Sequence, residues 1–361
     1  MKVLIVDDSV VFRRVIAETL ATLPEVEVAG VAATGAAAVQ KARDLRPDLI
    51  TLDIEMPGMN GLEVLETLRS EGIESNVILV SALTLRGSAL TLEGLSKGAF
   101  DFITKPAGDG YDSNRNSIKE ELVPRVRALA QRVAVRNILR SRGPEIQQRT
   151  EPRPSTQFRI DHASKLRKPE LVVIGVSTGG PSALARLVSR LPGNLGVPVV
   201  VVQHMPPLFT RMLADNLGGN SQLAVREACD REVLVPNCIY IAPGGSQMRL
   251  VPGVNKAKTI EITDDPAENN CKPAVDYLFR SVANHFPGEA LAVILTGMGS
   301  DGTIGLRLLK RHGCRVLAQD ESTCVVFGMP KAAIEAGVVD AVLPIDDIAP
   351  GITSAVRGAR A

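Results

Sequence analysis

The stretch Gly175-Val176-Ser177-Thr178-Gly179-Gly180 lies between two patterns that fix the local fold. The apolar run at 171–174 before it predicts a short buried strand, and Pro181 after it opens an amphipathic pattern that predicts a helix. Glycine permits the tight bend that such a strand-to-helix turn requires. A serine on that turn stands in front of the amides of the helix N-terminus. The stretch therefore predicts a parallel α/β sheet and makes Ser177 a candidate nucleophile.

Composition narrows the classes of protein to which the chain can belong. Its 361 residues are enough for two or three domains, and a hydrophobic content of 45% is ample for buried cores. A net charge of +1 and an aromatic content of 3% argue against nucleic acid as a partner. The five cysteines form no C-x-x-C pair, which indicates reduced thiols. No apolar run approaches the roughly 20 residues of a membrane span, and Asp7 and Asp8 interrupt any signal peptide. We therefore expect a cytoplasmic protein without membrane insertion.

Residues 1–122 alternate apolar runs with amphipathic helical patterns. Five such strand–helix units predict a doubly wound, flavodoxin-like parallel sheet, which binds ligands at the carboxyl ends of its strands. The last helix is predicted to start near Ile118 or Val123, with Pro124 in its first turn or at a kink. The expected strands span 2–6, 26–32, 49–52, 77–80 and 100–103, and the other helices span 10–23, 35–45, 61–70 and 85–97.

Polar side chains gather at the carboxyl ends of these strands. Asp7 and Asp8 follow the first strand and Asp53 the third, while Ser81 ends the fourth and Lys105 follows the fifth. Helix capping explains a single aspartate at a strand end, but it does not explain five such residues on one sheet. Three carboxylates that converge with a lysine predict a hard-cation site beside an acceptor for a phosphoryl group.

The segment 1–122 resembles the receiver domain of two-component response regulators. The stretches that carry the resemblance are Ile5-Val6-Asp7-Asp8-Ser9, the run at 53–61, Ser81-Ala82 and Lys105-Pro106. The resemblance implies that Asp53 accepts a phosphoryl group from a histidine kinase. It also implies a Mg²⁺ ion held by Asp8, Asp53 and the carbonyl of Glu55, with Asp7 acting through water.

The same resemblance implies a switch at the ends of the fourth and fifth strands. Lys105 is expected to pair with the phosphoryl oxygens, and Ser81 is expected to move to hydrogen-bond them. Phe102 stands where the family keeps an aromatic switch residue, although an ordinary buried strand position explains it equally well.

A helix end and a basic connector at 123–169 separate this segment from a second α/β pattern at 170–354. Periodicity disappears from about residue 137, and the Arg- and Pro-rich composition favours a solvated linker over a site for an acidic partner or anionic membrane. The second pattern predicts another doubly wound, Rossmann-like domain. Its expected strands span 171–174, 197–202, 238–241, 290–295, 315–318 and 341–343, and its expected helices span 181–190, 208–217, 274–284, 302–311 and 330–336.

A serine nucleophile needs a base, and the chain offers four histidines. His162 lies in the connector, where nothing is expected to hold it still. His285 and His312 end predicted helices, where capping explains them. His204 follows a Val-rich strand and precedes two prolines, which predicts a rigid loop facing a ligand. We therefore predict that His204 is the base for Ser177.

The carboxylate that orients this base is predicted at another strand end. Asp301 follows the strand at 290–295, in a loop whose glycines let backbone N–H groups approach a ligand. The N–H of Met298 is therefore a candidate oxyanion donor beside that of Thr178. Asp320 also follows a strand and is the rival, although hydrogen bonding within its loop explains it. The chain order Ser, His, Asp differs from that of α/β-hydrolases and indicates a convergent triad.

The second domain resembles the catalytic domain of the chemotaxis protein-glutamate methylesterase (CheB) family, which joins a receiver to this hydrolase in this order. The matching stretches are those at 175–181, 203–206, 239–245, 295–302 and 328–333. The resemblance implies a triad of Ser177, His204 and Asp301, with Met298 as an oxyanion amide. It also implies that the substrates are methyl-accepting chemotaxis receptors.

Two positions depart from the family pattern. The family often has histidine after Pro-Gly-Gly-x, where this chain has Gln247, and histidine before its Pro-Ser-Val-Asp-like stretch, where this chain has Cys271. Neither position falls on the proposed triad, but both could alter how a substrate docks.

The sequence thus predicts phosphorylation-activated demethylation of glutamyl methyl esters on receptors, with possible deamidation of receptor glutamines. Two other functions fit a receiver joined to an α/β domain. The second domain could only bind a partner, against which the intact Ser177, His204 and Asp301 weigh. It could also be a small-molecule esterase under receiver control, which the relative rates on receptor and small esters would reveal.

Overall fold

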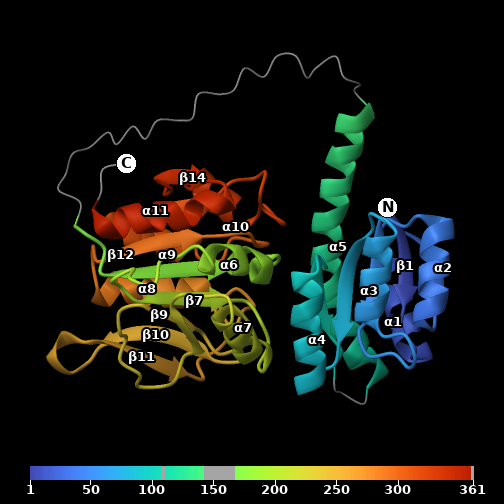
Figure 1. Cartoon of the computed structure of the whole chain (residues 1–361), viewed down its shortest axis with the longest axis horizontal. Helices are drawn as coiled ribbons and strands as arrows, with labels where there is room; N and C mark the ends of the chain where they lie inside the picture. The colour runs from blue at the N-terminus through green and yellow to red at the C-terminus, as the bar shows by residue number, and fades with distance from the viewer. Residues whose placement is uncertain (107–109, 142–166, 359–361) are drawn as a thin grey trace. The chain divides into compact units, whose positions relative to one another are not determined.

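The structure is a computed structural model that describes residues 1–106, 110–141 and 167–358. The connector expected between the domains lies outside these residues over 142–166, and His162 lies there with it. The chain divides into two compact units, Met1–Ser155 and Thr156–Ala361, and each is described by itself (Figure 1). Within the described ranges, no helix is both long and apolar enough to span a membrane.

The first unit is built on five parallel strands in the order β2-β1-β3-β4-β5. The strands are β1 (Lys2–Val6), β2 (Glu27–Ala32), β3 (Leu49–Asp53), β4 (Asn76–Ser81) and β5 (Asp101–Thr104). The connecting helices are α1 (Val10–Leu20), α2 (Gly35–Leu45), α3 (Gly61–Ser70), α4 (Leu85–Ser96) and α5 (Tyr111–Ser141). Because the strand order reverses between β1 and β3, their carboxyl ends border the crevice where such sheets bind ligands.

Helix α5 starts earlier than the sequence pattern predicts. It begins at Tyr111 rather than near Ile118 or Val123, and it passes through Pro124 instead of starting there. The predicted apolar stripe is confirmed, since its members Ile118, Leu122, Val126, Leu129 and Val133 are all buried. Burial on both sides of the proline outweighs the one backbone hydrogen bond that the proline removes.

The second unit is built on seven parallel strands in the order β14-β13-β12-β6-β7-β9-β8. The strands are β6 (Leu171–Val176), β7 (Val199–Gln203), β8 (Ala224–Glu227), β9 (Cys238–Ile241), β12 (Ala290–Ile294), β13 (Arg315–Gln319) and β14 (Ala341–Leu343). From β6 the chain moves to β7 on one side, while β12 returns on the other. The crevice of this sheet therefore opens at the carboxyl end of β6. The two sheets confirm the predicted pair of doubly wound α/β domains.

Helices cover both faces of the second sheet (Figure 1). Helices α6 and α11 pack together, and α8 packs against α9. Their bounds are α6 (Gly180–Val188), α7 (Phe209–Gly218), α8 (Val275–His285), α9 (Thr303–Arg311), α10 (Met329–Glu335) and α11 (Ile345–Arg357). The sequence pattern did not predict β8 or α11.

An antiparallel hairpin is a further element that the sequence pattern did not predict. Strands β10 (Gln247–Pro252) and β11 (Lys258–Thr263) are joined by a short 3-10 turn, Val254–Lys256, and β10 packs against α8. Met248, Leu250 and Ile260 are buried, whereas Arg249 and Glu261 form an ion pair at 2.8 Å across the strands. This alternation is that of a sheet with one buried face.

Gly61 sets the distance between α3 and the end of β3. A Cβ at Gly61 would lie 2.3 Å from the carbonyl oxygen of Asp53 and 2.8 Å from Cα of Ile54. We therefore expect Gly61→Ala to destabilise the first unit by about 1–3 kcal/mol, because the backbone has to move. Thermal unfolding of the full chain measures this. Gly110→Ala is the control, since its nearest atom, Cβ of Ser113, would lie 3.6 Å away; an equal loss in both variants would contradict the account.

Candidate functional site

The crevice of the first sheet brings together the polar residues predicted there. Asp7 and Asp53 are buried, and Nζ of Lys105 lies 2.9 Å from Oδ2 of Asp7 and 2.8 Å from Oδ2 of Asp53. Asp8 is exposed at the rim. Carboxylate oxygens of Asp7, Asp8 and Asp53 lie within 4.8 Å of one another. Three carboxylates thus face a single lysine.

This excess of negative charge makes the cluster suited to a cation. Burial, with the charge of Asp7 added to it, raises the pKa of Asp53 to about 6 even though Lys105 opposes the shift. Burial likewise raises the pKa of Asp7. Within the described part of the chain, Oδ2 of Asp7 and Oδ2 of Asp53 have Lys105 as their one partner, and they share its single positive charge. A divalent cation with a preference for oxygen fits this excess of buried carboxylate charge.

The other residues predicted for this site lie around the cluster. The backbone N–H of Glu55 donates to Oδ1 of Asp53 at 3.2 Å, so the loop after β3 turns back towards the carboxylates. Ser81 is buried at the end of β4, and its hydroxyl donates to the carbonyl of Ala82 at 3.3 Å. Phe102 is buried on β5.

Sequence reasoning missed Arg13, which lies one turn into α1. Its Nη1 donates to the carbonyl oxygens of Asp7, at 2.7 Å, and Asp8, at 2.9 Å. The guanidinium therefore fixes the loop that presents both carboxylates. The only signal was its position four residues after Ser9, the residue that caps α1.

In the second unit, Ser177 follows β6 directly and Gly180 begins α6, as the sequence predicts. Gly179 has a φ of 76°, and a Cβ there would lie 2.3 Å from Cβ of Val325, so the turn requires glycine. A Cβ at Gly297 would lie 2.8 Å from Cβ of Ser177. The loop after β12, which carries Met298, therefore approaches the serine closely because it has a glycine there.

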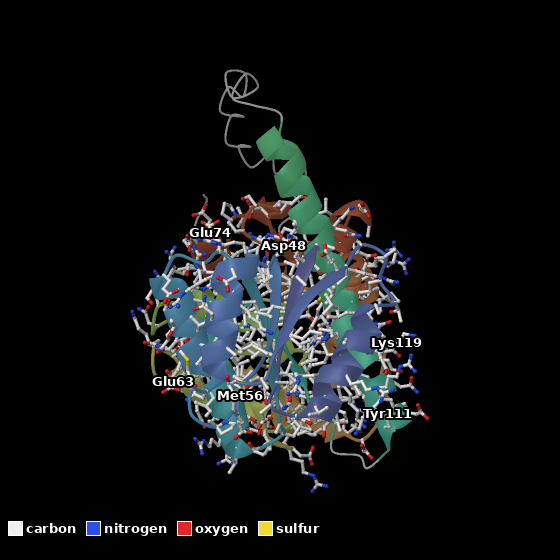
Figure 2. The ribbon with its side chains drawn as sticks, turned by 90° about the vertical axis from the view of Figure 1, so that its right-hand side faces the viewer. Asp48, Met56, Glu63, Glu74, Tyr111 and Lys119 are labelled. Atoms are coloured by element: carbon white, nitrogen blue, oxygen red, sulfur yellow. The ribbon has the colours of Figure 1, made fainter. Side chains whose placement is uncertain are left out.

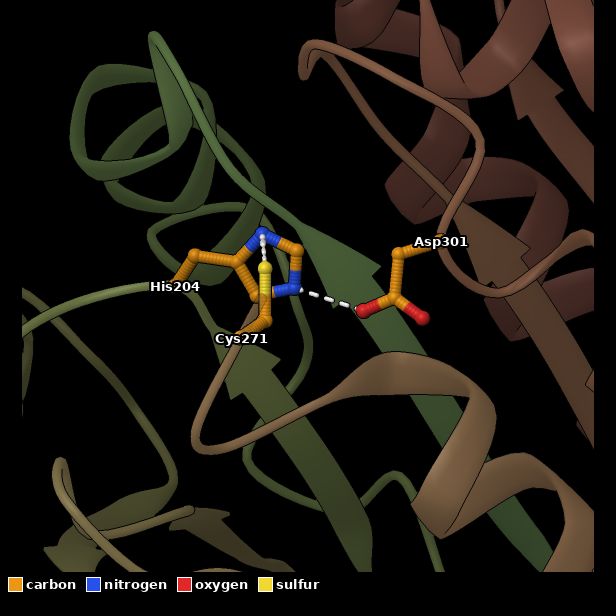
Figure 3. A group of neighbouring side chains, drawn as sticks. All are labelled: His204, Cys271 and Asp301. Atoms are coloured by element: carbon orange, nitrogen blue, oxygen red, sulfur yellow. Dashed lines mark hydrogen bonds and ion pairs between the residues drawn. The ribbon is translucent and has the colours of Figure 1, made fainter. Parts of the chain in front are cut away.

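His204 and Asp301 meet across the crevice (Figure 3). His204 follows β7, Asp301 lies in the loop after β12, and Nε2 of the histidine is 2.8 Å from Oδ2 of the aspartate. The other ring nitrogen, Nδ1, lies 3.5 Å from Sγ of Cys271. Since Nε2 faces a carboxylate, it carries the proton of the neutral imidazole, and Nδ1 is the nitrogen that accepts a second proton.

The carboxylate of Asp301 is buried and held by several donors. Its Oδ2 accepts from the backbone N–H of Val275 at 2.7 Å, and its Oδ1 accepts from those of Asp276 and Gly302 at 2.9 Å. Val275 begins α8, so the partial positive charge of the helix N-terminus also stabilises the anion. Asn269 Nδ2 donates to Oδ1 at 2.9 Å and to Oδ2 of Asp276 at 3.1 Å.

These contacts favour the charged form of the His204–Asp301 pair. Burial alone would lower the pKa of His204, but the hydrogen bonds of its ring with Asp301 and Cys271 outweigh burial and raise the pKa to about 9. Burial would raise the pKa of Asp301, yet the histidine and the backbone amides hold it below its usual value. Asp301 is thus an anion at neutral pH, and it strengthens the basicity of His204.

The serine hydroxyl is not yet engaged by this pair. Among the described residues, Ser177 Oγ makes no hydrogen bond to His204. Within the described residues, the backbone N–H groups of Thr178 and Met298 also donate no hydrogen bond. Both are therefore available to an oxyanion. Gln203, whose importance the sequence did not reveal, donates from Nε2 to the carbonyls of Ser177 at 3.0 Å and His204 at 3.1 Å. This buried amide ties the two turns together.

The two departures from the family pattern lie next to each other in space. Gln247 is fully buried, and its Nε2 donates to the carbonyls of Pro266 at 3.1 Å and Cys271 at 3.3 Å. Its Oε1 accepts from the N–H of Ala274 at 2.9 Å. Gln247 therefore fixes the loop that holds Cys271 against His204. The contact of Cys271 with the histidine was not predicted, because the two residues are 67 positions apart.

The rivals for the triad have structural roles. Asp320 accepts from the N–H of Thr323 at 3.1 Å and the hydroxyl of Ser322 at 2.6 Å, which closes its own loop. His312 caps the end of α9, and His285 is the last residue of α8.

Comparisons with known proteins identify the families of the two domains. The family model described as CheB methylesterase matches residues 172–352, and the response regulator receiver domain matches residues 3–111. The protein-glutamate methylesterase/protein-glutamine glutaminase of Desulfotalea psychrophila is 45% identical over 363 residues, covering 99% of each chain. The protein of that name from Bacillus subtilis is 41% identical over 365 residues, covering 100% of this chain and 99% of its own.

A solved structure gives the same result for the second unit. The crystal structure of the Thermotoga maritima CheB methylesterase catalytic domain is 44% identical and has a TM-score of 0.51. It matches 52% of this chain and 99% of its own. Fold and site together define a receiver joined to an α/β hydrolase. The chain belongs to the CheB methylesterase family.

The pKa of the His204 ring is a direct measure of its interaction with Asp301. We expect its pKa to be about 9, and to fall in Asp301→Asn because the carboxylate that stabilises the imidazolium is lost. NMR titration of the ring protons measures this, since only four histidines need assignment. His312→Gln serves as a control that removes a different histidine. A pKa of His204 that stays unchanged in Asp301→Asn would contradict the proposed coupling.

Proposed function

We propose that this chain removes methyl groups from glutamyl methyl esters on methyl-accepting chemotaxis receptors, under control of receiver phosphorylation. In this proposal residues 1–122 form the receiver, 123–169 the helix end and connector, and 170–354 the catalytic domain. The observation that carries it is the 2.8 Å contact of His204 with the buried Asp301, at the strand ends that flank Ser177. The relatives named above have this activity in their names.

The reaction begins with proton transfer from Ser177 to His204. Nδ1 of His204 takes the hydroxyl proton while Nε2 keeps its hydrogen bond to Asp301. The serine oxygen bonds to the ester carbonyl carbon, and the N–H groups of Thr178 and Met298 stabilise the oxyanion. The bond to the methoxy oxygen then breaks, and His204 returns its proton so that methanol leaves. Water repeats the steps on the acyl-enzyme and releases the glutamate carboxylate.

The thiol of Cys271 must move away from His204 for this reaction, because it contacts Nδ1, the nitrogen that accepts the serine proton. A neutral imidazole is also required, so catalysis uses the deprotonated fraction of a group whose pKa is about 9. Substrate binding that displaces the thiol removes one of the contacts that raise this pKa. Binding of the substrate therefore also increases the fraction of His204 that is neutral and able to act as a base.

Receptor glutamines offer the same carbonyl with an amide leaving group. Attack by Ser177 gives the same acyl-enzyme, and His204 protonates the leaving nitrogen so that ammonia departs. Deamidation is therefore a second activity of the one site. The name glutaminase in the relatives supports it.

The receiver supplies the control. Asp53 is the proposed phosphoacceptor, with a histidine kinase as donor, and the receiver match is consistent with Mg²⁺ in this step. Asp8, Asp53 and the Glu55 carbonyl would hold the ion, with Asp7 acting through water; bound there, it would neutralise phosphoryl charge. Lys105 would pair with the phosphoryl oxygens.

The switch residues complete this control. Ser81 would turn from the Ala82 carbonyl towards the phosphoryl group, and Phe102 would follow it. Because these reactions use a kinase and the receptor segments bearing glutamates, we place the protein in the cytoplasm. Neither a domain that only binds a partner nor a small-molecule esterase is favoured by relatives that match the full chain.

Methanol release from methylated receptor tests the proposal. We expect release that rises with a small-molecule phosphodonor and Mg²⁺, and that loses this rise in Asp53→Asn. Ser177→Ala should lower the rate by as much as about 10⁶-fold if the three groups act as a unit. Release that is absent with verified receptor methylation, or that persists in Ser177→Ala, would overturn the proposal.

Asn269 is predicted to position Asp301 through its hydrogen bond to Oδ1. We expect Asn269→Ala to lower kcat about tenfold and leave KM nearly unchanged, because a positioning contact supports the transition state. Asn270→Ala is the matched control, since Asn270 has the same left-handed backbone but no side-chain hydrogen bond within the described residues. The pKa of His204 should also change in Asn269→Ala alone. Equal kinetics in the two variants would contradict this role.

A further inference from the structure

We propose that His204 and Cys271 form a binding site for a borderline-soft divalent cation such as Zn²⁺, and that the bound ion inhibits the hydrolase. The two residues are brought together from the loops after β7 and before α8 (Figure 3). Binding is independent of the reaction catalysed, whereas inhibition rests on the proposed function.

The geometry of the two donor atoms fits such an ion. Nδ1 of His204 and Sγ of Cys271 lie 3.5 Å apart. Zinc binds nitrogen at about 2.05 Å and sulfur at about 2.3 Å, so two such ligands of a tetrahedral ion lie about 3.6 Å apart. The observed separation of Nδ1 and Sγ is close to this value. An ion can therefore replace the thiol proton with little movement of the two side chains.

Asp301 prepares the histidine for this role. Its hydrogen bond with Nε2 holds a proton on that nitrogen, so Nδ1, which faces Cys271, is the nitrogen that binds an ion once the imidazolium has lost its other proton. A carboxylate that orients a histidine in this way is the usual partner of a zinc ligand. One ligand atom from each of His204, Cys271 and Asp301 lies within 4.8 Å of the others.

The loop that carries Cys271 is held firmly. The backbone N–H of Cys271 donates to the carbonyl of Glu268 at 2.8 Å, and the Glu268 N–H donates back at 3.1 Å. Arg280 holds the Glu268 carboxylate through two bonds of 2.7 Å, and Gln247 holds the Cys271 carbonyl. The thiol is thus presented by a braced loop, yet His204 and Cys271 are both partly exposed and within reach of an ion.

The donor types separate this site from the one in the receiver. Asp7, Asp8 and Asp53 offer only oxygen, which Mg²⁺ prefers, while nitrogen and thiolate sulfur prefer Zn²⁺. Saturating Mg²⁺ would therefore fill the receiver and leave His204 and Cys271 open to Zn²⁺. An ion on Nδ1 occupies the lone pair that takes the Ser177 proton, so hydrolysis stops.

The test uses the full chain, freed of metal with a chelator and kept in saturating Mg²⁺, with Co²⁺ as a spectroscopic substitute for Zn²⁺. We expect a thiolate-to-cobalt charge-transfer band that Zn²⁺ abolishes by displacement. The band should be lost in Cys271→Ser and kept in Cys229→Ser, which removes an exposed cysteine elsewhere. A band that survives in Cys271→Ser, or is absent from the unaltered chain, would overturn the proposal.

Calorimetry with Zn²⁺ separates the loss of a ligand at position 271 from misfolding of the variant. Cys271→His exchanges one ligand for another, so we expect it to bind Zn²⁺ without giving the cobalt band. Cys271→Ser should bind more weakly by on the order of 100-fold, because loss of an orienting partner alone costs 10–100-fold. Zinc affinity equal in Cys271→Ser and the unaltered chain would refute the site.

Inhibition is measured as methanol release with Zn²⁺ divided by release without it, for each variant. We expect this ratio to fall in the unaltered chain and in Cys229→Ser, and to stay near one in Cys271→Ser. If methanol release fails without zinc, the proposed function fails while the cobalt and calorimetric results still decide the site. Zinc binding with an unchanged ratio would refute the inhibition.

Discussion

The carboxylate of Asp301 is 5% exposed and is surrounded by four N–H donors and the ring of His204. An isolated charge at this depth costs several kcal/mol, and it is stable only because each oxygen is hydrogen-bonded. Those donors come from the N-terminus of α8, the loop after β12 and Asn269. The anion can be buried only once these segments are assembled, and the fold thereby fixes the tautomer and basicity of His204. Every function we assign to the second unit depends on that constraint.

Much of this arrangement could be predicted from local sequence. Apolar runs of four to six residues, followed directly by Asp53 or Ser177 and one residue later by His204, predict a parallel sheet and place the polar side chain at its functional edge. The core stripe of α5 was predicted correctly because its spacing does not depend on where the helix starts. The start itself was wrong, because Pro124 and the first member of the apolar stripe suggested a terminus that lies earlier, at Tyr111.

The residues that tune the site could not be predicted in this way. Cys271 reaches His204, Gln247 braces the loop of Cys271, and Asn269 bridges two buried carboxylates, all through contacts between distant segments. None of them follows the carboxyl end of a strand of the parallel sheet, and the β10–β11 hairpin, which begins at Gln247, was itself unexpected. The family pattern marked Gln247 and Cys271 as unusual, but only the structure shows that the two act on one loop.

The central claim is that the His204–Asp301 pair activates Ser177 as the nucleophile. Covalent labelling by a fluorophosphonate, located by peptide mass spectrometry, tests it most directly, because such probes report a serine activated by a neighbouring base. The account predicts labelling of Ser177 in the full chain, and its loss in both His204→Ala and Asp301→Ala. Labelling of another residue would contradict it, and so would labelling of Ser177 that is as fast in the two variants as in the unaltered chain.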